Sequence, residues 1–203
     1  MGETGFWSLL LAVAVFGGIH SWTASMGLKK RFALRCKDNF ERFYRLFYNG
    51  VAAVTLLLVL VLVVILPDRF LYRIPAPWIW LTLILQGIAL WGMAVSMGRS
   101  GTARFLGIDQ ALGRNSSEHT DELVVDGLYR WVRHPIYLFS LVFIWLMPEM
   151  SMNILGLNLG LTLYLFIGTW FEEKKLEAAF GETYTRYKQK TPMFFPFRLQ
   201  SRK

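Results

Sequence analysis

Long apolar stretches separated by short polar ones are the dominant pattern of this chain. A helix needs about 20 predominantly apolar residues to cross the hydrocarbon core of a bilayer. Three stretches meet this requirement, Phe6–Ser25, Phe47–Leu66 and Trp78–Met97. After a polar stretch, Gly98 to Arg133, the segments Pro135–Met147 and Met152–Phe171 flank the turn "PEMS". The pattern predicts an all-α integral membrane protein with about five transmembrane helices. The last two form a helical hairpin, whose first arm is short for a crossing and is expected to be tilted or partly recessed.

The composition agrees with a membrane protein and narrows the possible partners. Hydrophobic residues make up 54% of the 203 residues and charged residues 18%, whereas soluble domains carry about 25% charged residues. The net charge of +8 comes from basic residues that flank the apolar segments. This placement indicates anionic lipid headgroups, and not nucleic acid, as the partner. The single cysteine, Cys36, excludes an internal disulfide and offers no metal-ligand pattern, so we expect no metal site.

The distribution of Lys and Arg predicts the orientation in the membrane. Seven lie between Lys29 and Arg45, five between Gly98 and Arg133, and eight in the tail from Lys174. The loop after the second span has two and the hairpin turn has none. Because basic loops stay in the cytoplasm, we expect the N-terminus outside and the C-terminus inside, in a bacterial inner membrane or an equivalent compartment. Nothing in the sequence argues for a repeat-type interface, so we expect a monomer.

The stretch "RWVRHPIY" places two potential cations directly before an apolar helix. Proline is favoured in the first turn of a helix, so Pro135 is predicted to begin the fourth membrane helix. Arg133 and His134 then lie at its N-terminus, where free N–H groups favour an anion and the guanidinium fork suits a carboxylate or phosphate. The alternative is that Arg133 is an ordinary cytoplasmic anchor and His134 an interfacial residue.

Two adjacent carboxylates, Glu172 and Glu173, end the fifth apolar segment on the same predicted side. Carboxylates near hydrocarbon are expensive and are usually paired or functional; pairing with Arg133 or with neighbouring lysines is the alternative. The hairpin brings the start of the fourth helix and the end of the fifth together. The four side chains therefore predict a bipolar rim that suits a ligand with both a carboxylate and an ammonium. Tyr137, in the first turn after Pro135, adds a ring for stacking or for cation–π attraction.

These motifs resemble those of the integral-membrane methyltransferases. The similarity covers G-L-Y-R-W-V-R-H-P-I-Y at 127–137, E-E-K-K-L-E-A-A-F-G-E-T-Y-T-R-Y-K at 172–188 and "TPMFFP" at 191–196. The superfamily includes isoprenylcysteine carboxyl methyltransferases and phospholipid N-methyltransferases. The stretches "RFLGIDQAL" and "GIHSWTAS" are similar to bacterial members, including methanethiol S-methyltransferases. Before residue 127 the similarity is weaker and rests on the number and hydrophobicity of the spans.

The resemblance implies S-adenosylmethionine as methyl donor, with S-adenosylhomocysteine as product, in a cytoplasm-facing pocket. The length of the chain makes one membrane domain over 1–203 the expectation, with three spans in 1–97 and the catalytic part in 98–203. Arg133, His134, Glu172 and Glu173 are the candidate catalytic residues. The candidate cofactor-binding residues add Gly127, Tyr129, Pro135, Tyr137, Tyr184 and Tyr187, with Pro192 in the closing C-terminal segment. Which of Glu172, Glu173 and His134 would act as a base stays open.

The acceptor is expected to be lipophilic or small and membrane-permeable, and to enter from the bilayer. The first expectation is a prenylcysteine-like carboxylate; a small thiol or an aminophospholipid are the alternatives. Candidate acceptor-lining residues are His20, Gln86, Arg104, Asp109 and Gln110. Two other classes remain open: a non-catalytic membrane scaffold that keeps the site residues for structure, and a sterol-reductase-like enzyme. The reductase would bind a nicotinamide cofactor, whose phosphates demand more cations than the neighbours of Arg133 provide.

Overall fold

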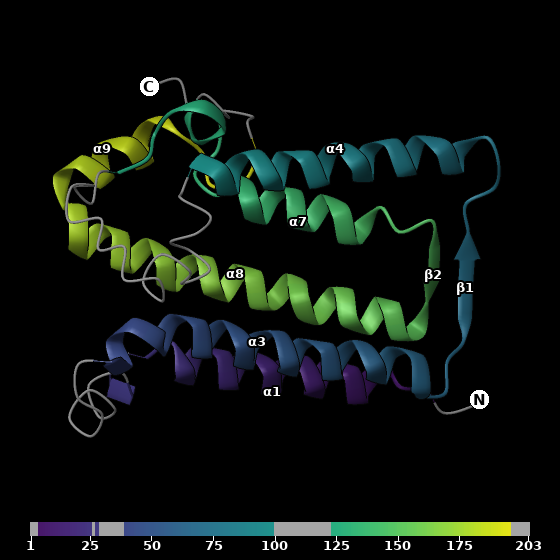
Figure 1. Cartoon of the computed structure of the whole chain (residues 1–203). Helices are drawn as coiled ribbons and strands as arrows, with labels where there is room; N and C mark the ends of the chain where they lie inside the picture. Colours follow the sequence, from purple (N-terminus) through teal and green to yellow (C-terminus); the bar gives the residue numbers. More distant parts are fainter. Residues whose placement is uncertain (1–3, 26, 29–38, 100–122, 196–203) are drawn as a thin grey trace. The chain divides into compact units, whose positions relative to one another are not determined.

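The computed structural model describes residues 4–25, 27–28, 39–99 and 123–195, without the side chains of 39–42 and 99. Most of these residues are helical (Figure 1). In chain order the elements are α1 (Phe6–Thr23), α3 (Asn39–Ile65), β1 (Phe70–Arg73), α4 (Trp78–Arg99), the 3-10 helix η1 (Gly127–Arg130), α7 (Pro135–Trp145), β2 (Glu149–Ser151), α8 (Met152–Phe180) and α9 (Glu182–Lys190).

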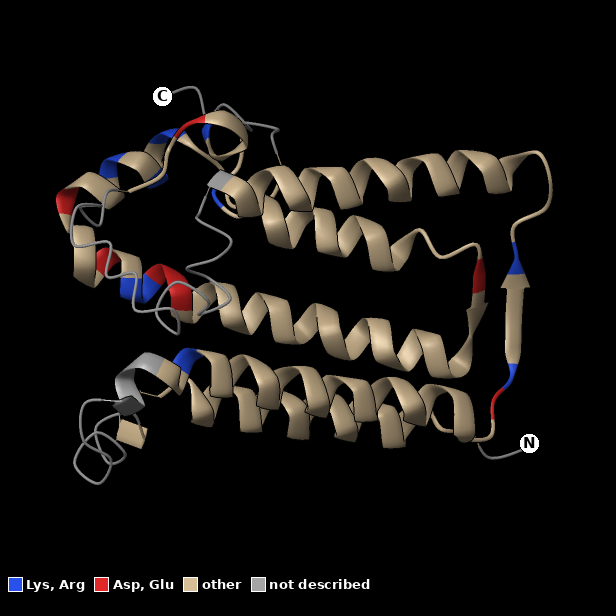
Figure 2. Ribbon diagram, in the orientation of Figure 1, with Lys and Arg blue, Asp and Glu red and all other residues tan. Residues whose placement is uncertain are grey.

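The prediction of a helical membrane protein is confirmed. Within the described residues, four helices are long and apolar enough to cross a membrane, namely α1, the part of α3 from Phe43, α4 and α8. Figure 2 shows that α1 and α7 carry no Lys, Arg, Asp or Glu along their length. Helix α7 has 11 residues, about 16 Å at 1.5 Å per residue, and is the short arm expected from the sequence. Whether it crosses the bilayer, and hence the count of five spans, remains a prediction.

Two helices extend beyond their apolar runs. Helix α3 begins at Asn39 where the apolar pattern predicted Phe47, and α8 ends at Phe180 where it predicted Phe171. The extension of α8, "EEKKLEAAF", is rich in strong helix formers, so the helix continues after hydrophobicity ends. This extension carries the Glu172–Glu173 pair on a regular helix.

The described residues fall into two compact units that interleave along the chain. One contains residues up to Arg73 together with Glu149–Tyr164, and the other contains Ile74–Arg99, the described residues up to Pro148, and Leu165 onward. Helix α8 contributes its first half to one unit and its second half to the other. The candidate residues from 127 onward all belong to the second unit.

In the first unit, α1, α3 and the first half of α8 share an apolar core built around Leu9, Val13, Phe16, Val59 and Leu157. The sequence G-L-N-L-G at 156–160 lets α8 approach α1 closely. A Cβ added at Gly156 would lie 2.9 Å from the carbonyl oxygen of Phe6, and one at Gly160 would lie 3.0 Å from the Cβ of Val13. G-x-x-x-G spacing places two small residues on one helix face and permits such contacts between membrane helices.

One end of the first unit is closed by polar contacts around the fully buried Asn153. Its side-chain amide donates to the carbonyl oxygens of Val63 and Leu66, at 3.3 and 3.2 Å, and its backbone N–H donates to Asp68. Strands β1 and β2 pair antiparallel beside it, and an Arg73–Glu149 ion pair joins their ends. This small sheet was not predicted, because each strand is too short to show a periodic pattern.

In the second unit, α4 packs against α7. Gly92 leaves room for the ring of Phe139, which a Cβ would meet at 2.6 Å. The buried Gln86 donates from Nε2 to the carbonyl oxygen of Phe143, at 3.0 Å. These contacts fix α7 against α4, so the residues at the start of α7 are held by a packed helix.

We expect Gly156→Ala to destabilise the protein by about 1–3 kcal/mol, because the added methyl meets a backbone oxygen that cannot move aside alone. Gly168→Ala, in the same helix, is the matched control, since a Cβ there meets nothing within 4 Å. Thermal melting of the detergent-purified variants measures the difference. Equal melting temperatures for the two variants would contradict close α1–α8 packing at Gly156.

Candidate functional site

The chain enters the candidate site through a short 3-10 turn. Gly127 has φ +58°, a left-handed conformation that glycine adopts without steric cost, and it opens η1 after Asp126. The chain then reaches the buried Val132 and the Arg133–His134 pair. Pro135 occupies the first turn of α7 with His134 directly before it. The prediction that Pro135 begins this helix is confirmed.

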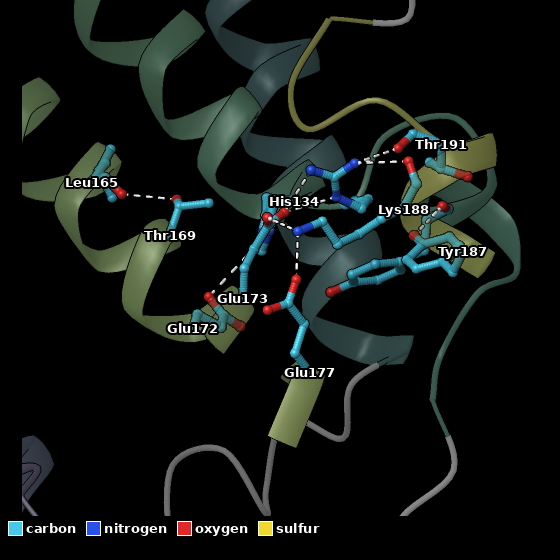
Figure 3. A network of polar contacts seen from close by, with 11 residues as sticks. His134, Leu165, Thr169, Glu172, Glu173, Glu177, Tyr187, Lys188 and Thr191 are labelled. Carbon is cyan, nitrogen blue, oxygen red and sulfur yellow. Dashed lines mark hydrogen bonds and ion pairs between the residues drawn. The ribbon is translucent and has the colours of Figure 1, made fainter. Parts of the chain in front are cut away.

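The second half of α8 supplies the carboxylates. Thr169 and Glu173, four residues apart on one helix face, are both buried, and the Thr169 hydroxyl donates to the carbonyl oxygen of Leu165. Glu172 lies beside this face, and its side chain is 44% exposed. After Gly181, at φ +53°, the chain turns into α9, which brings Lys188 back to Glu173 and Glu177 (Figure 3).

A buried ion pair between Arg133 and Glu173 is central to the site. Nε and Nη2 of Arg133 lie 2.8 and 2.7 Å from Oε1 of Glu173, and both side chains are 9% exposed. Two buried charges are tolerated only when they are paired and hydrogen-bonded with good geometry. The prediction that the start of the fourth helix meets the end of the fifth is therefore confirmed by direct contact.

Arg133 also fastens the segment that follows α9. Its Nη1 donates to the carbonyl oxygens of Thr191, at 2.6 Å, and Lys188, at 3.3 Å. The backbone N–H groups of Arg133 and His134 donate to the carbonyl oxygens of Pro192 and Met193. Side chain and backbone thus hold residues 188–193 against the start of α7 (Figure 3).

His134 lies between the two carboxylates and is 5% exposed. Its Nε2 is 3.2 Å from Oε1 of Glu173, and its Nδ1 is 3.7 Å from Oε2 of Glu172. The imidazole stacks on the ring of Tyr137, with centroids 5.6 Å apart and planes at 8°. Phe194 lies on another side, with ring centroids 6.0 Å apart. Contacts on several sides therefore fix the orientation of the imidazole.

Three residues of α9 complete the network. Nζ of Lys188 lies 3.5 Å from Oε2 of Glu173 and 2.5 Å from Oε1 of Glu177. Tyr184 is 1% exposed, and burial followed by the nearby Glu173 charge raises the pKa of its phenol. The Tyr187 hydroxyl donates to the carbonyl oxygen of Tyr129, at 2.5 Å. Both phenols therefore keep their protons at neutral pH.

Most of the sequence-predicted site residues in the second unit come together. Arg133, His134, Glu172 and Glu173 form the ionic centre, Pro135 and Tyr137 are in the same helix start, and Tyr129, Tyr184 and Tyr187 surround it through the contacts above. Gly127 begins the turn that leads to it. Gln86 is elsewhere: it bonds Phe143, more than two helical turns along α7 from His134. Arg104, Asp109 and Gln110 lie outside the described residues.

His20 belongs to the first unit, where its side chain contacts tyrosine and phenylalanine rings and a tyrosine hydroxyl. Its Nε2 is 2.5 Å from the hydroxyl of Tyr48. Its ring stacks near Phe16, with centroids 5.8 Å apart, and meets Tyr164 edge-on at 6.0 Å. A Cβ at Gly17 would lie 2.9 Å from the Tyr164 ring, so this glycine makes room for it. His20 is thus an interhelical contact residue in the first unit.

Lys188, Thr191 and Glu177 are the site residues that the sequence analysis missed. Lys188 read as part of a basic tail, and Thr191 contributes only its backbone carbonyl, for which no residue type is diagnostic. The i, i+4 spacing of Glu173 and Glu177 was the one available signal, because it places both carboxylates on one helix face. Among the residues that the structure describes, no three His, Cys, Asp or Glu side chains are grouped as metal ligands.

We expect Tyr187→Phe to lower stability by about 1 kcal/mol at neutral pH, because it removes the hydrogen bond to Tyr129. Burial raises the pKa of Tyr187 from 10 to about 12. The folded protein thus holds this proton more tightly than the unfolded chain. The resulting stability is present below pH 10 and is lost as the pH rises towards 12.

Melting temperatures from neutral pH to pH 12 measure both effects. Tyr187→Phe should melt lower at neutral pH and lose less stability than the wild type over the alkaline range. Tyr72→Phe is the control, because Tyr72 is exposed in β1. A Tyr187→Phe curve parallel to that of the wild type over the alkaline range would contradict this assignment.

Comparison with known proteins supports the resemblance seen in the sequence. The chain is 42% identical over 71 residues to methanethiol S-methyltransferase 1 of Bradyrhizobium diazoefficiens, a match that covers 35% of this chain and 25% of that protein. It is 41% identical over 70 residues to methanethiol S-methyltransferase of Mycobacterium tuberculosis, covering 34% and 29%. It is 34% identical over 89 residues to human protein-S-isoprenylcysteine O-methyltransferase, covering 41% and 31%. The chain thus spans between a quarter and a third of the length of these curated relatives.

No solved structure matches the chain significantly. The matches to named methyltransferases confirm the resemblance to the integral-membrane methyltransferase superfamily. The sequence profile of one family, described as NnrU protein, extends much further and covers residues 8–197. With nearly the whole chain matched, this protein belongs to the NnrU family.

Proposed function

We propose that this protein is an S-adenosylmethionine-dependent methyltransferase of the membrane, acting on a small lipophilic acceptor. The observation that carries the proposal is the corner formed by Glu172 and His134. Oε2 of Glu172 is buried and has no hydrogen-bond partner among the described residues, and it lies 3.7 Å from Nδ1 of His134. An orphaned buried carboxylate oxygen costs free energy unless a partner arrives. A ligand that carries cationic or hydroxyl groups would supply that partner.

The residues of the second unit fit the methyl donor. Glu172 would bind a cationic or hydroxyl group of the cofactor, and the imidazole of His134 would contact it from the neighbouring side. Tyr137, stacked on His134, offers an aromatic face of the kind that attracts a sulfonium or stacks on a base. Tyr184, Tyr187 and the segment 188–193 would enclose the cofactor, as their contacts with Arg133 and Tyr129 support.

S-adenosylmethionine supplies an electrophilic methyl group on a sulfonium, so the protein's work is mainly to position two reactants and to exclude water. The packed helix start and the fastened segment 188–193 would provide a rigid wall. A thiol acceptor must also lose a proton. Nδ1 of His134 and the carboxylate of Glu172 would be the nearest candidates for receiving it, since Glu173 is already engaged by Arg133, His134 and Lys188.

A small thiol is the acceptor best supported by the relatives, because those from Bradyrhizobium and Mycobacterium are named for methanethiol. A carboxylate on a prenylated cysteine is the second candidate, supported by the match to the human isoprenylcysteine enzyme. Both acceptors are lipophilic, which is consistent with entry from the bilayer. Since the matched stretch covers between a quarter and a third of each relative, the acceptor must be found by assay.

The first test is calorimetric binding of S-adenosylhomocysteine to the detergent-purified full chain. We expect binding in the micromolar range for the wild type, and a loss of about tenfold or more in His134→Ala, which corresponds to about 1.4 kcal/mol. Glu182→Ala is the control, because Glu182 is exposed on α9 and pairs only with Arg186 among the described residues. No binding to correctly folded wild type would contradict the proposal.

Transfer of a labelled methyl group then identifies the acceptor. The radioactive donor is incubated with a short alkanethiol, a farnesylcysteine analogue or an aminophospholipid, and the extracted product is counted. We expect the thiol to be labelled, with no label in the His134→Ala reaction. Label in the farnesylcysteine analogue alone would favour the second candidate. Label in none of the three, with intact cofactor binding, would contradict a small lipophilic acceptor of these classes.

The orientation is part of the proposal, with the N-terminus outside and the C-terminus in the cytoplasm. The distribution of Lys and Arg supports this direction, and the contacts of Gly5 with Pro67 and of Asn153 with Asp68 support the alternation of α1, α3 and α8 that it requires. They gather the start of α1, the end of α3 and the start of α8 at one end of the first unit, as alternating crossings require. A fluorescent protein that folds only in the cytoplasm, fused to the C-terminus, should fluoresce. Fluorescence from the same reporter inserted between Pro67 and Pro77, and none from the C-terminal fusion, would reverse the orientation.

A further inference from the structure

Phe194 lies between His134 and a face of α8 that is both apolar and exposed. We infer that the Phe194 ring determines the size of the methyl acceptor, so that a small thiol reaches His134 and a prenyl-length chain is excluded. The inference rests on the proposed function for the reaction, and it names the residue that separates the two candidate acceptors. Those acceptors differ in their nucleophile, but for a binding site the larger difference is the length of the apolar chain.

The exposed face of α8 carries large apolar side chains at helical spacing. Four of them are between 45% and 62% exposed, Leu163, Phe166, Ile167 and Trp170. They recur at intervals of three or four residues along the helix, which places them on one side of it. Helix α8 is long and apolar enough to cross a membrane, and apolar side chains on the outside of such a helix face hydrocarbon. A lipophilic molecule that approaches the second unit along α8 therefore meets these residues first.

Two phenylalanine rings lead from this face to the imidazole. The Phe166 ring meets the Phe194 ring edge to face, with centroids 5.1 Å apart and planes at 76°. The Phe194 ring centroid lies 6.0 Å from that of His134. Phe166 is 45% exposed and Phe194 is 4% exposed, so the exposed fraction falls from the outer ring to the inner one. All three residues belong to the second unit, and Phe194 stands between a bilayer-facing ring and the candidate site.

Other sides of His134 are occupied by different groups. One face of the imidazole stacks on Tyr137, and Nε2 lies 3.2 Å from Oε1 of Glu173. His134 is 5% exposed. Phe194 is the group that the imidazole presents towards Phe166 and the exposed face of α8. A molecule that comes from that face thus encounters the Phe194 ring before it reaches His134.

The backbone holds Phe194 in this position. The N–H groups of Arg133 and His134 donate to the carbonyl oxygens of Pro192 and Met193, at 2.9 and 3.2 Å. These bonds end at the residue directly before Phe194 and fix the chain against the start of α7. The next residue, Phe195, is 63% exposed. Of these two adjacent phenylalanines, the first is packed against the site and the second is not, so the second is a matched control.

A fixed aromatic ring at this place discriminates by length. Under the proposed function, the sulfur of a thiol acceptor gives its proton close to Nδ1 of His134. A thiol with few carbons needs little space beyond its sulfur. A prenyl chain must continue towards the bilayer, where the rings of Phe194 and Phe166 lie. Closely packed side chains respond to a change of even one methylene group, so the ring excludes the longer chain.

The experiment measures kcat/KM for ethanethiol and dodecanethiol with the full chain in bilayer nanodiscs. We expect the wild type to prefer ethanethiol. In Phe194→Ala the ratio of dodecanethiol to ethanethiol should rise about tenfold or more, and in Phe194→Leu it should rise less. Each thiol partitions into the same bilayer for every variant, so partitioning cancels when the ratios are compared. Phe195→Ala should keep the wild-type ratio.

The ratio separates a size determinant from a residue needed only for folding. Loss of packing at Phe194 would lower kcat/KM for both thiols and leave their ratio unchanged. Phe194→Leu keeps an apolar side chain at the buried position and carries the test if Phe194→Ala does not fold. Phe194→Trp adds volume and should move the ratio in the opposite direction. Melting temperatures and S-adenosylhomocysteine affinities show that the compared variants are folded and bind the cofactor.

An unchanged ratio in folded Phe194→Ala and Phe194→Leu would overturn the inference. So would a wild type that prefers dodecanethiol, or a rise of equal size in Phe195→Ala. If the wild type binds no S-adenosylhomocysteine or methylates neither thiol, the proposed function fails. Crosslinking with a photoreactive dodecanethiol analogue then still tests Phe194, because it needs no turnover. The analogue should label the start of α7 in Phe194→Ala and not in the wild type, and equal labelling of the two would overturn the inference.

Discussion

The buried charge of Glu173 is the constraint on which the candidate site depends. A carboxylate close to a membrane-spanning helix must be compensated, because its isolated charge would cost several kcal/mol in surroundings of low polarity. The compensation comes from three residues in two sequence regions: Arg133 and His134 before α7, and Lys188 in α9. These partners close the chain on itself, so that one electrostatic requirement sets the position of the start of α7, the end of α8 and the C-terminal segment.

The two units solve the problem of joining helices by different means. In the first unit, α8 approaches α1 through Gly156 and Gly160, and the contact is one of shape, with the amide of Asn153 closing one end. In the second unit, the contacts around Arg133 are ionic and reach backbone carbonyls. Close packing of complementary helix surfaces suits a scaffold, because dispersion attraction between packed helices requires neither solvent nor a partner ion. A polar network costs more to bury but places donors and acceptors where a ligand can be recognised.

Membership of the NnrU family covers almost the entire chain, while the matches to named methyltransferases cover about a third of it. Under the proposed function, the two findings would correspond to a shared cofactor-binding part and a variable remainder. An enzyme that holds a methyl donor with a fixed set of polar residues can change acceptor by changing the surrounding helices. The acceptor is therefore the feature of this protein for which similarity to short stretches of relatives is the weakest guide.

The sequence by itself determined the helical membrane fold, the helix start at Pro135 and the meeting of Arg133 and His134 with Glu172 and Glu173. Each depends on local rules, the hydrophobic length of a span, the missing N–H of proline and the connectivity of a hairpin. Only the tertiary structure decided which of the two adjacent glutamates is bound by other residues of the protein. It also decided that Lys188 and the Thr191 carbonyl join this network, and that β1 pairs with β2. Adjacent residues of one type are equivalent in a sequence pattern, but the side chains of adjacent residues in a helix point in directions about 100° apart. One of the pair is therefore buried against its partners and the other is left accessible.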